Sequence, residues 1–284
     1  MEFVFVYGTL RQGEQYHDWL GDSRLFSAHA QVRGRLEDTG LGYPVLVEEE
    51  GSVAGELYEV TEAVLHRLDE LEDYYGPGDQ RNEYERIKTE ADTDNGKVEA
   101  WQYVYRHAQR QPAIPEGDWK LYRLKQAGEF LYFAYGSCMD LQRIEQAGRA
   151  DSFKHAEGRG ILDGFQVAFT LPLADGGRAD LVECGGRAEG KLYRISCECL
   201  ENYLYTREGV DEGLYRPAVV RVQRENGAFE DAVTFVVVEK KAETAPPAHY
   251  LHEILRGSRP VVSAGYYAGL EERFKVEFGY TAAD

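Results

Sequence analysis

The feature that most constrains the fold of this chain is a short apolar stretch that occurs twice and ends each time in a Tyr-Gly-hydroxyl turn. The first copy is EFVFVYGTLR at residues 2–11, and the second copy, FLYFAYGSCM, occupies residues 130–139. An apolar run that stops at a glycine predicts a buried strand followed by a tight turn. Since each copy is followed by enough sequence for a core of its own, the repeat predicts two domains rather than a solenoid.

The expected helices and strands come in a similar order in both halves. In the first half, strands are expected at 2–6, 30–36, 44–47, 51–60, 84–88 and 97–105, and helical segments at 12–20 and 61–72. In the second half, strands are expected at 130–134, 160–170, 189–195, 217–223 and 232–238, helices at 140–147, 196–208, 246–257 and 263–274, and a glycine-rich loop at 176–180. Short strands separated by glycine predict an α+β fold with small closed barrels of mixed or antiparallel strands.

The border between the two predicted domains lies in a stretch with two prolines and few large apolar residues. This stretch is HAQRQPAIPEG, residues 107–117, and a short helix is expected after it at 118–127. The sequence therefore predicts one domain at 1–106, a linker at 107–128 and a second domain at 129–284.

Composition narrows the classes of partner. The formal net charge of -18 argues against a nucleic acid or an anionic membrane surface as a partner, because neither favours an acidic protein. No apolar segment approaches the ~20 residues of a membrane-spanning helix, and no secretory signal is expected. The four cysteines and seven histidines show no zinc-binding or metalloprotease spacing. We therefore expect a cytoplasmic monomer that binds a small molecule and needs no metal or cofactor.

The two turns admit two interpretations. In one, the backbone N–H groups after the glycine form a pocket for a carboxylate or an oxyanion. The candidate ligand-binding residues are then Tyr7, Gly8, Thr9 and Leu10 in the first half and Tyr135, Gly136, Ser137, Cys138 and Met139 in the second. In the other, each glycine is a bulge at a strand end, and Thr9 and Ser137 merely cap the next helix. A nucleophilic role for Cys138 is a weaker possibility, because the first copy has Leu10 at that place.

Each half also carries an acid at the end of its middle helix. Glu72 follows Leu68 by four residues, on the apolar stripe of the helix expected at 61–72, and Glu208 follows Leu204 by four. Arg207 is expected to lie off the ridge of Glu208. Burial and the helix C-terminus both favour a neutral acid, so each pKa is expected to be raised, as suits a general acid/base. Alternatively, Glu72 is solvated or pairs with Arg81 or Arg86.

A Tyr-led strand follows each acid. Arg86, in Tyr84-Glu85-Arg86, is a candidate to hold a substrate carboxylate with two hydrogen bonds. It is equally a candidate for an ordinary surface ion pair with one of the many acids nearby.

Together these motifs resemble the γ-glutamylcyclotransferase-like superfamily. The first half is most similar to its AIG2-like and γ-glutamylamine cyclotransferase branch, at residues 6–13, 43–46, 53–60, 68–72, 84–86 and 100–105. The second half resembles the γ-glutamylcyclotransferase branch, at residues 133–137, 176–181, 190–193, 208–209, 213–215, 250, 254 and 257. The second half departs from that pattern at Cys138, where the family usually has Asn, and at Tyr205-Thr206-Arg207, which replaces the usual Leu-Asp.

The resemblance implies two small mixed β-barrels flanked by helices, with Glu72 and Glu208 as general acid/base and the Tyr-Gly loops as binding site for a γ-glutamyl group. It implies an enzyme that releases 5-oxoproline and a free amine from a γ-glutamyl amide, after attack by the substrate's own α-amine. No metal, cofactor or covalent intermediate is implied. Two other functions stay open at this point: a module that binds γ-glutamyl or similar anionic metabolites without turnover, and a protein-interaction scaffold.

Overall fold

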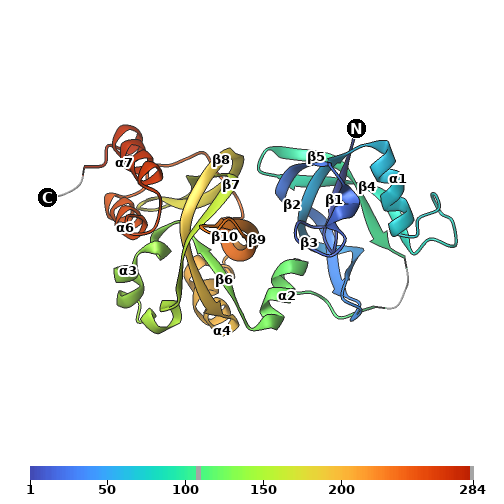
Figure 1. The fold of residues 1–284 in the computed structure, drawn as a ribbon, viewed down its shortest axis with the longest axis horizontal. Helices are drawn as coiled ribbons and strands as arrows, with labels where there is room; N and C mark the ends of the chain where they lie inside the picture. Colours follow the sequence, from blue (N-terminus) through green and yellow to red (C-terminus); the bar gives the residue numbers. More distant parts are fainter. Residues whose placement is uncertain (107–109, 282–284) are drawn as a thin grey trace. The chain divides into compact units, whose positions relative to one another are not determined.

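A computed structural model describes residues 1–106 and 110–281 of the chain, which forms two compact units, Met1–Arg123 and Leu124–Asp284. Each unit contains one closed barrel of five strands (Figure 1). The α+β fold with two tandem barrels is therefore confirmed. The border between the units falls inside the segment expected as a linker, of which residues 107–109 lie outside the described residues.

The barrel of the first unit has the strand order β1-β3-β2-β4-β5. Strand β1 runs antiparallel to β3 and parallel to β5, where Val4 pairs with Trp101, and this pairing closes the barrel. The elements of this unit are β1 (Glu2–Val6), the 3-10 helix η1 (His17–Leu20), β2 (Arg24–Asp38), β3 (Pro44–Val60), α1 (Glu62–Leu71), β4 (Tyr84–Thr93), β5 (Gly96–Tyr105) and the start of α2 (Trp119–Ala127).

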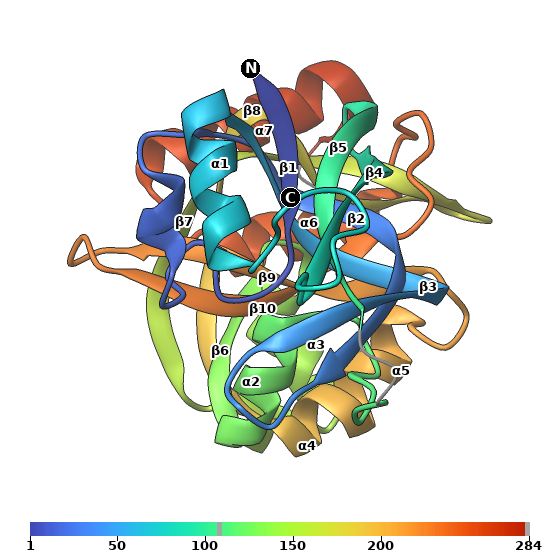
Figure 2. The ribbon, with the colours of Figure 1, turned by 90° about the vertical axis from the view of Figure 1, so that its right-hand side faces the viewer.

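Strand β1 is apolar from Phe3 to Val6, and both of its faces are buried from Val4 onwards. Phe5 lies in the core inside the barrel, whereas Val4 and Val6 belong to a second core shared with Leu65 and Leu68 of α1. Helix α1 accordingly lies beside β1 on the outside of the barrel (Figure 2). This packing fixes the end of α1 next to the turn that follows β1.

The barrel of the second unit has the corresponding order β10-β6-β8-β7-β9, with β6 parallel to β10. Helix α6 packs against the short helix η2 that follows β6. The elements are β6 (Glu129–Ala134), η2 (Ser137–Met139), α3 (Leu141–Gln146), η3 (Ala150–Phe153), β7 (Ala156–Leu173), β8 (Gly176–Ser196), α4 (Cys197–Cys199), the π-helix η4 (Leu200–Leu204), α5 (Tyr205–Glu208), β9 (Tyr215–Arg224), β10 (Phe229–Val237), α6 (Ala248–Ser258) and α7 (Ala264–Phe278).

Two expectations about local structure are wrong. Residues 176–180 belong to β8 rather than to a loop, and the glycines there allow a neighbouring segment to approach: a Cβ on Gly177 would lie 2.2 Å from the Thr244 carbonyl oxygen. Residues 12–16 form turns rather than a helix, and the Tyr16 N–H donates to the Thr9 carbonyl seven residues back. Only His17–Leu20 form a helical turn.

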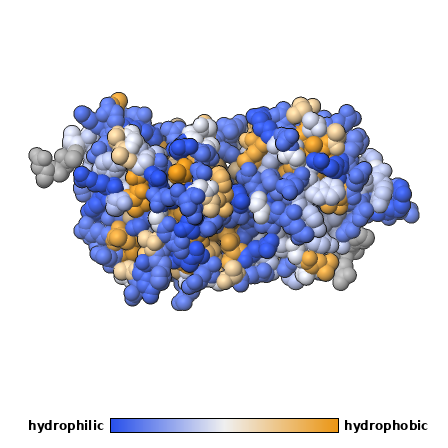
Figure 3. Space-filling view, viewed as in Figure 1, coloured by the Kyte–Doolittle hydropathy of each residue, from blue (hydrophilic) through white to orange (hydrophobic). Residues whose placement is uncertain are grey.

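The surface is dominated by charged and polar side chains. The face in Figure 3 is mainly hydrophilic, with hydrophobic residues in small separate areas, in keeping with the net charge of -18. Among the helices of the described residues, none has the length and apolar character that crossing a bilayer requires.

Candidate active site

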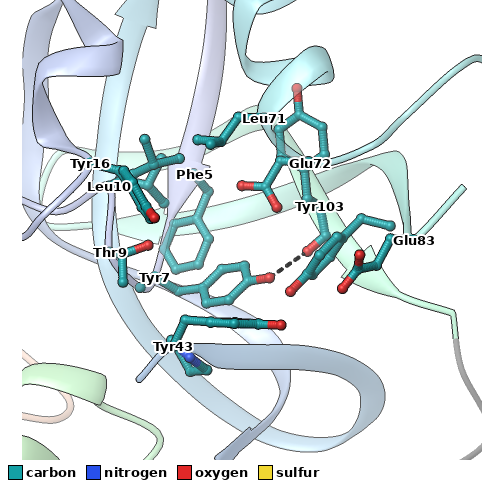
Figure 4. Close-up of a pocket in the computed structure, with 14 residues that line it drawn as sticks. Phe5, Tyr7, Thr9, Leu10, Tyr16, Tyr43, Leu71, Glu72, Glu83 and Tyr103 are labelled. Atoms are coloured by element: carbon teal, nitrogen blue, oxygen red, sulfur yellow. Dashed lines mark hydrogen bonds between the residues drawn. The ribbon is translucent and has the colours of Figure 1, made fainter. Parts of the chain in front are cut away.

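A pocket of about 250 Å³ in the first unit brings together the Tyr-Gly turn and the acid at the end of α1. The carboxyl of Glu72 points into this pocket above the ring of Tyr7, with Thr9 and Leu10 on one side and Glu83 on the other (Figure 4). The 14 residues drawn there are Phe5, Val6, Tyr7, Gly8, Thr9, Leu10, Tyr16, Tyr43, Pro44, Leu71, Glu72, Glu83, Tyr84 and Tyr103.

The position of Glu72 follows from the sequence of α1. Thr61 caps the helix by accepting a hydrogen bond from the Val64 N–H at 3.3 Å, and Leu65 and Leu68 bury one face. Glu72 ends the helix, with its N–H donating to the Leu68 carbonyl at 3.0 Å. Its carboxyl thus stands at the C-terminal end of the helix, where the dipole disfavours a negative charge.

The surroundings of Glu72 favour its neutral form. Burial in the pocket, together with the nearby charges of Glu83 and Asp73, raises the pKa of Glu72 to about 8. Within residues 1–106 and 110–281, its carboxyl has no hydrogen bond and no ion pair. The alternative that Glu72 pairs with a cation is wrong, because Arg81 binds Asp79 and Arg86 binds Asp69.

The turn after β1 offers backbone donors to the pocket. No hydrogen bond is made by the N–H groups of Gly8, Thr9 and Leu10 within the described part of the chain. A Cβ on Gly8 would lie 2.9 Å from the ring of Pro44, so a larger residue displaces the turn. Thr9 does not cap a helix, since η1 has no side-chain cap. Successive free N–H groups at one edge of a pocket are suited to a carboxylate or an oxyanion.

A buried ion network holds the far end of this turn. The Arg11 side chain is only 2% exposed and binds Glu56 at 3.3 Å and Asp118 at 2.7 Å. Glu56 also accepts hydrogen bonds from the Gln12 N–H and the Tyr58 hydroxyl, both at 2.8 Å. Asp118 comes from the predicted linker, so that segment helps to build the first unit.

The tyrosines below Glu72 are fixed by a second chain of contacts. Tyr7 donates its hydroxyl hydrogen to the carbonyl of Tyr103 at 2.9 Å, and the Tyr103 hydroxyl donates to Asp69 at 2.8 Å. Arg86 donates from Nη1 to both Asp69 oxygens, at 2.9 and 2.7 Å, and does not line the pocket. The predicted substrate-binding residue Arg86 is therefore not brought to the turn; it binds Asp69 and lies over the rings of Tyr74 and Trp101.

The second unit also brings its acid and its turn together, but around much less space. Its pocket has a volume of about 30 Å³ and is lined by Tyr132, Tyr135, Gly136, Ser137, Cys138, Ala179, Glu208, Tyr215, Phe235 and Tyr250. Tyr135 repeats the role of Tyr7, donating to the Phe235 carbonyl at 2.6 Å. Met139, predicted as a ligand-binding residue, is buried but does not line this pocket.

The side chain of Arg207 occupies the space next to the second turn. Its Nε lies 3.3 Å from a Glu208 oxygen and donates to the Cys138 sulfur at 3.1 Å, and its Nη2 donates to the Ser137 hydroxyl at 3.0 Å. Arg207 and Glu208 are consecutive residues of α5, and the Arg207 side chain nevertheless reaches the Glu208 carboxyl. A π-helical turn at Leu200–Leu204 precedes α5, so the spacing of a regular α-helix does not place Glu208 relative to Leu200. Burial still raises the pKa of Glu208, although Arg207 opposes that effect.

The main residue that sequence reasoning missed is Glu83. It lies at the end of the long loop after Glu72, and its N–H donates to the Asp73 carbonyl at 3.2 Å, which pinches the loop shut. The only sequence signal was its place directly before Tyr84, which itself lines the pocket. Tyr43 was also missed, because its place beside the turn depends on how the following strand β3 packs.

No group of three or more His, Cys, Asp or Glu side chains in the described segments is arranged to hold a metal ion.

Comparisons with known proteins agree with this architecture. Residues 4–121 match the family described as γ-glutamyl cyclotransferase, AIG2-like, and residues 187–270 match the AIG2-like family. YkqA of Bacillus subtilis, a provisionally named γ-glutamylcyclotransferase, is 40% identical over 92% of both chains. The crystal structure of YkqA superimposes with a TM-score of 0.85, covering 97% of this chain and 98% of YkqA. The γ-L-glutamyl-butirosin B γ-glutamyl cyclotransferase of Niallia circulans is 46% identical, over 45% of this chain and 81% of that protein.

Proposed function

Because this chain belongs to the AIG2-like γ-glutamylcyclotransferase family, we propose that its first unit cleaves a γ-glutamyl amide into 5-oxoproline and a free amine. The observation that carries the proposal is the pocket in which Glu72, with its raised pKa, faces the free N–H groups of Gly8, Thr9 and Leu10. A proton acceptor and an anion-binding turn in one cavity are the groups that this cyclisation requires.

The substrate has the form R–NH–CO–CH2–CH2–CH(NH3+)–COO−. One anionic group, either the α-carboxylate or the oxyanion that develops on the γ-carbonyl, is bound by the N–H groups of the turn. The α-ammonium lies against Glu72, and its positive charge favours the carboxylate form of that residue. Holding the amine close to the γ-carbonyl lowers the barrier by removing the entropy cost of bringing them together.

Two proton transfers complete the reaction. The Glu72 carboxylate takes a proton from the α-ammonium, and the resulting amine attacks the γ-carbonyl to close a five-membered ring. Glu72 hands this proton to the leaving nitrogen, accepts the second proton from the ring nitrogen and passes it on in the same way, while the bond from carbon to the R–NH group breaks and the amine departs as R–NH3+. Both protons lost by the α-nitrogen end on the leaving amine, so Glu72 returns to its initial state. Such a shuttle contributes typically ~10²–10⁴-fold to the rate.

The test is the release of 5-oxoproline by a Glu72→Gln variant of the full chain. Glutamine keeps the shape of the side chain but cannot accept the proton, so we expect release to fall by at least about a hundredfold. The matched control is Glu70→Gln on the same helix, where the side chain is exposed and lies outside the pocket. Undiminished release by the folded Glu72→Gln protein would overturn the assignment of Glu72.

The relative from Niallia circulans is named for a γ-glutamyl amide of a large amine, butirosin B. By analogy, we propose that this chain also acts on an amide whose amine part extends beyond the pocket. A screen of γ-glutamyl amides for 5-oxoproline release tests this directly.

For the second unit a non-catalytic role is favoured by one observation, the contact of Arg207 with Glu208, Cys138 and Ser137. Arg207 stands where the ammonium of a substrate has to reach the acid, and only about 30 Å³ is left beside it. We propose that this unit does not turn over substrate as folded. The test measures the 5-oxoproline release that remains in Glu72→Gln and compares it with that of the double variant Glu72→Gln, Glu208→Gln. The two should be equal, and clearly more release by the single variant would show that the second unit is active.

A further inference from the structure

The pocket of the first unit contains two carboxylates and no basic side chain. Its acids are Glu72 and Glu83, and most of the remaining lining consists of aromatic and small apolar side chains. Tyr43 and Tyr84 line the same pocket as Glu83. A cavity with carboxylates and aromatic rings but no cation attracts positive charge.

The charge of Glu83 is not neutralised by a cation, in contrast to the charges of three other acids of this region. Asp69 binds Arg86 at 2.7 Å, Asp79 binds Arg81 at 2.8 Å, and Glu85 also pairs with an arginine, Arg106. Within residues 1–106 and 110–281, the Glu83 carboxyl has neither an ion pair nor a hydrogen bond. Its backbone is nevertheless fixed, since its N–H donates to Asp73 and its carbonyl accepts from the Arg106 N–H at 3.3 Å. A carboxylate that has no partner and stands on an anchored backbone contributes little to stability and is available to bind a cation.

The proposed reaction leaves Glu83 without a role on the γ-glutamyl side. The turn at residues 8–10 takes the anionic group, and Glu72 takes the α-ammonium. Glu83 lies across the pocket from Thr9 and Leu10 (Figure 4), so the part of the substrate that faces it is the amine part.

We propose that Glu83 selects γ-glutamyl amides whose amine part carries a second positive charge, such as amides of diamines or amino sugars. This inference rests on the proposed function of the first unit. A cationic tail forms an ion pair with Glu83, a neutral tail leaves its charge uncompensated, and an anionic tail is repelled by both acids. Since the tail charge does not change during the reaction, the effect is expected mainly on KM rather than on kcat.

The experiment compares three amides of matched length in the full chain: those of 1,4-diaminobutane, 1-aminopentane and 4-aminobutanoate. We expect kcat/KM to fall about tenfold from the cationic to the neutral tail, and further for the anionic tail, as for one charge pair in a partly solvated pocket. Glu83→Gln should reduce the difference between cationic and neutral tails to less than about threefold. Glu70→Gln removes the same charge outside the pocket and should keep the preference.

The outcomes separate this inference from the proposed function. If none of the three amides yields 5-oxoproline while the wider screen finds another γ-glutamyl amide that is cleaved, the charge selection is refuted and the proposed function stands; if no γ-glutamyl amide is cleaved, the proposed function itself is refuted. If all are cleaved and the cationic tail is not preferred, only the charge selection is wrong. If the preference survives in Glu83→Gln, its assignment to Glu83 is wrong. Should that variant fail to fold, the wild-type protein still decides: added salt must weaken turnover of the cationic amide more than that of the neutral one.

Discussion

Replacing Glu72 by Gln should stabilise the first unit while removing its activity. The pKa of Glu72 is raised from an ordinary 4.5 to about 8, which means that the fold disfavours the carboxylate. An acid whose pKa is raised on folding costs nothing below its unfolded pKa. The cost grows as the pH increases from 4.5 towards 8 and is constant above that. Glutamine carries no charge, so the variant avoids this cost.

The magnitude follows from the two pKa values. At ~1.36 kcal/mol per tenfold change in an equilibrium constant, the carboxylate costs about 1 kcal/mol at pH 5, about 3 at pH 7 and about 5 at pH 9. The free energy of unfolding of Glu72→Gln should exceed that of the wild type by amounts that increase in this order. Such a gain is what is expected when a residue is retained for its chemistry at the expense of stability.

The assay is urea unfolding of the full chain at pH 5, 7 and 9. Unfolding is monitored by hydrogen exchange at the amides of α1 and β1, because these report on the first unit. The control Glu70→Gln carries its substitution on the exposed face of α1 and should stay within about 0.5 kcal/mol of the wild type at every pH. A difference between Glu72→Gln and wild type that does not change with pH, or a less stable variant at pH 9, would refute the reasoning.

Three further predictions concern the same unit. Because Glu72 must be a carboxylate to accept a proton, kcat/KM for 5-oxoproline release should rise with pH through about 8 and then level off; a profile that falls over this range would contradict its role as base. Gly8→Ala places a Cβ 2.9 Å from Pro44 and should lower kcat/KM about a hundredfold by displacing the turn, as steady-state kinetics will show; unchanged kinetics would mean that the turn tolerates the shift. Asp118→Ala leaves the buried Arg11 with one partner fewer and should cost about 3 kcal/mol in urea unfolding, and a loss below about 1 kcal/mol would show that the network does not need Asp118.

The elements that sequence reasoning found are those whose pattern is local. Strand β1 is recognisable because its residues 3–6 form a continuous apolar run, as is typical of a strand buried on both faces. Helix α1 is recognisable because its cap at Thr61 and its apolar stripe lie close together in the sequence. The meeting of Glu72 with the Tyr-Gly turn follows from the same stripe, since a helix that packs its Leu65 and Leu68 on β1 must end near that strand.

The features that sequence reasoning missed depend on contacts between residues that are distant in the sequence. Arg86 is a residue type that often binds a substrate carboxylate, but here it binds Asp69. This pairing depends on the packing of β4 beside α1, which the sequence alone does not reveal. Gly176 and Gly177 were interpreted as a turn because glycine is typical both of turns and of places where another segment of the chain approaches the backbone closely. The contacts of Arg207 with Cys138 and Ser137 join residues about 70 positions apart, which no local spacing predicts.

The hydrogen bond from the Glu83 N–H to the Asp73 carbonyl closes the neck of the loop that separates the two acids of the pocket. Residues 74–82 thus form an insert with touching ends, and its length is not dictated by the barrel. None of its residues lines the cavity, so substitutions, extensions or loop exchanges within this insert should leave both carboxylates at their anchor points.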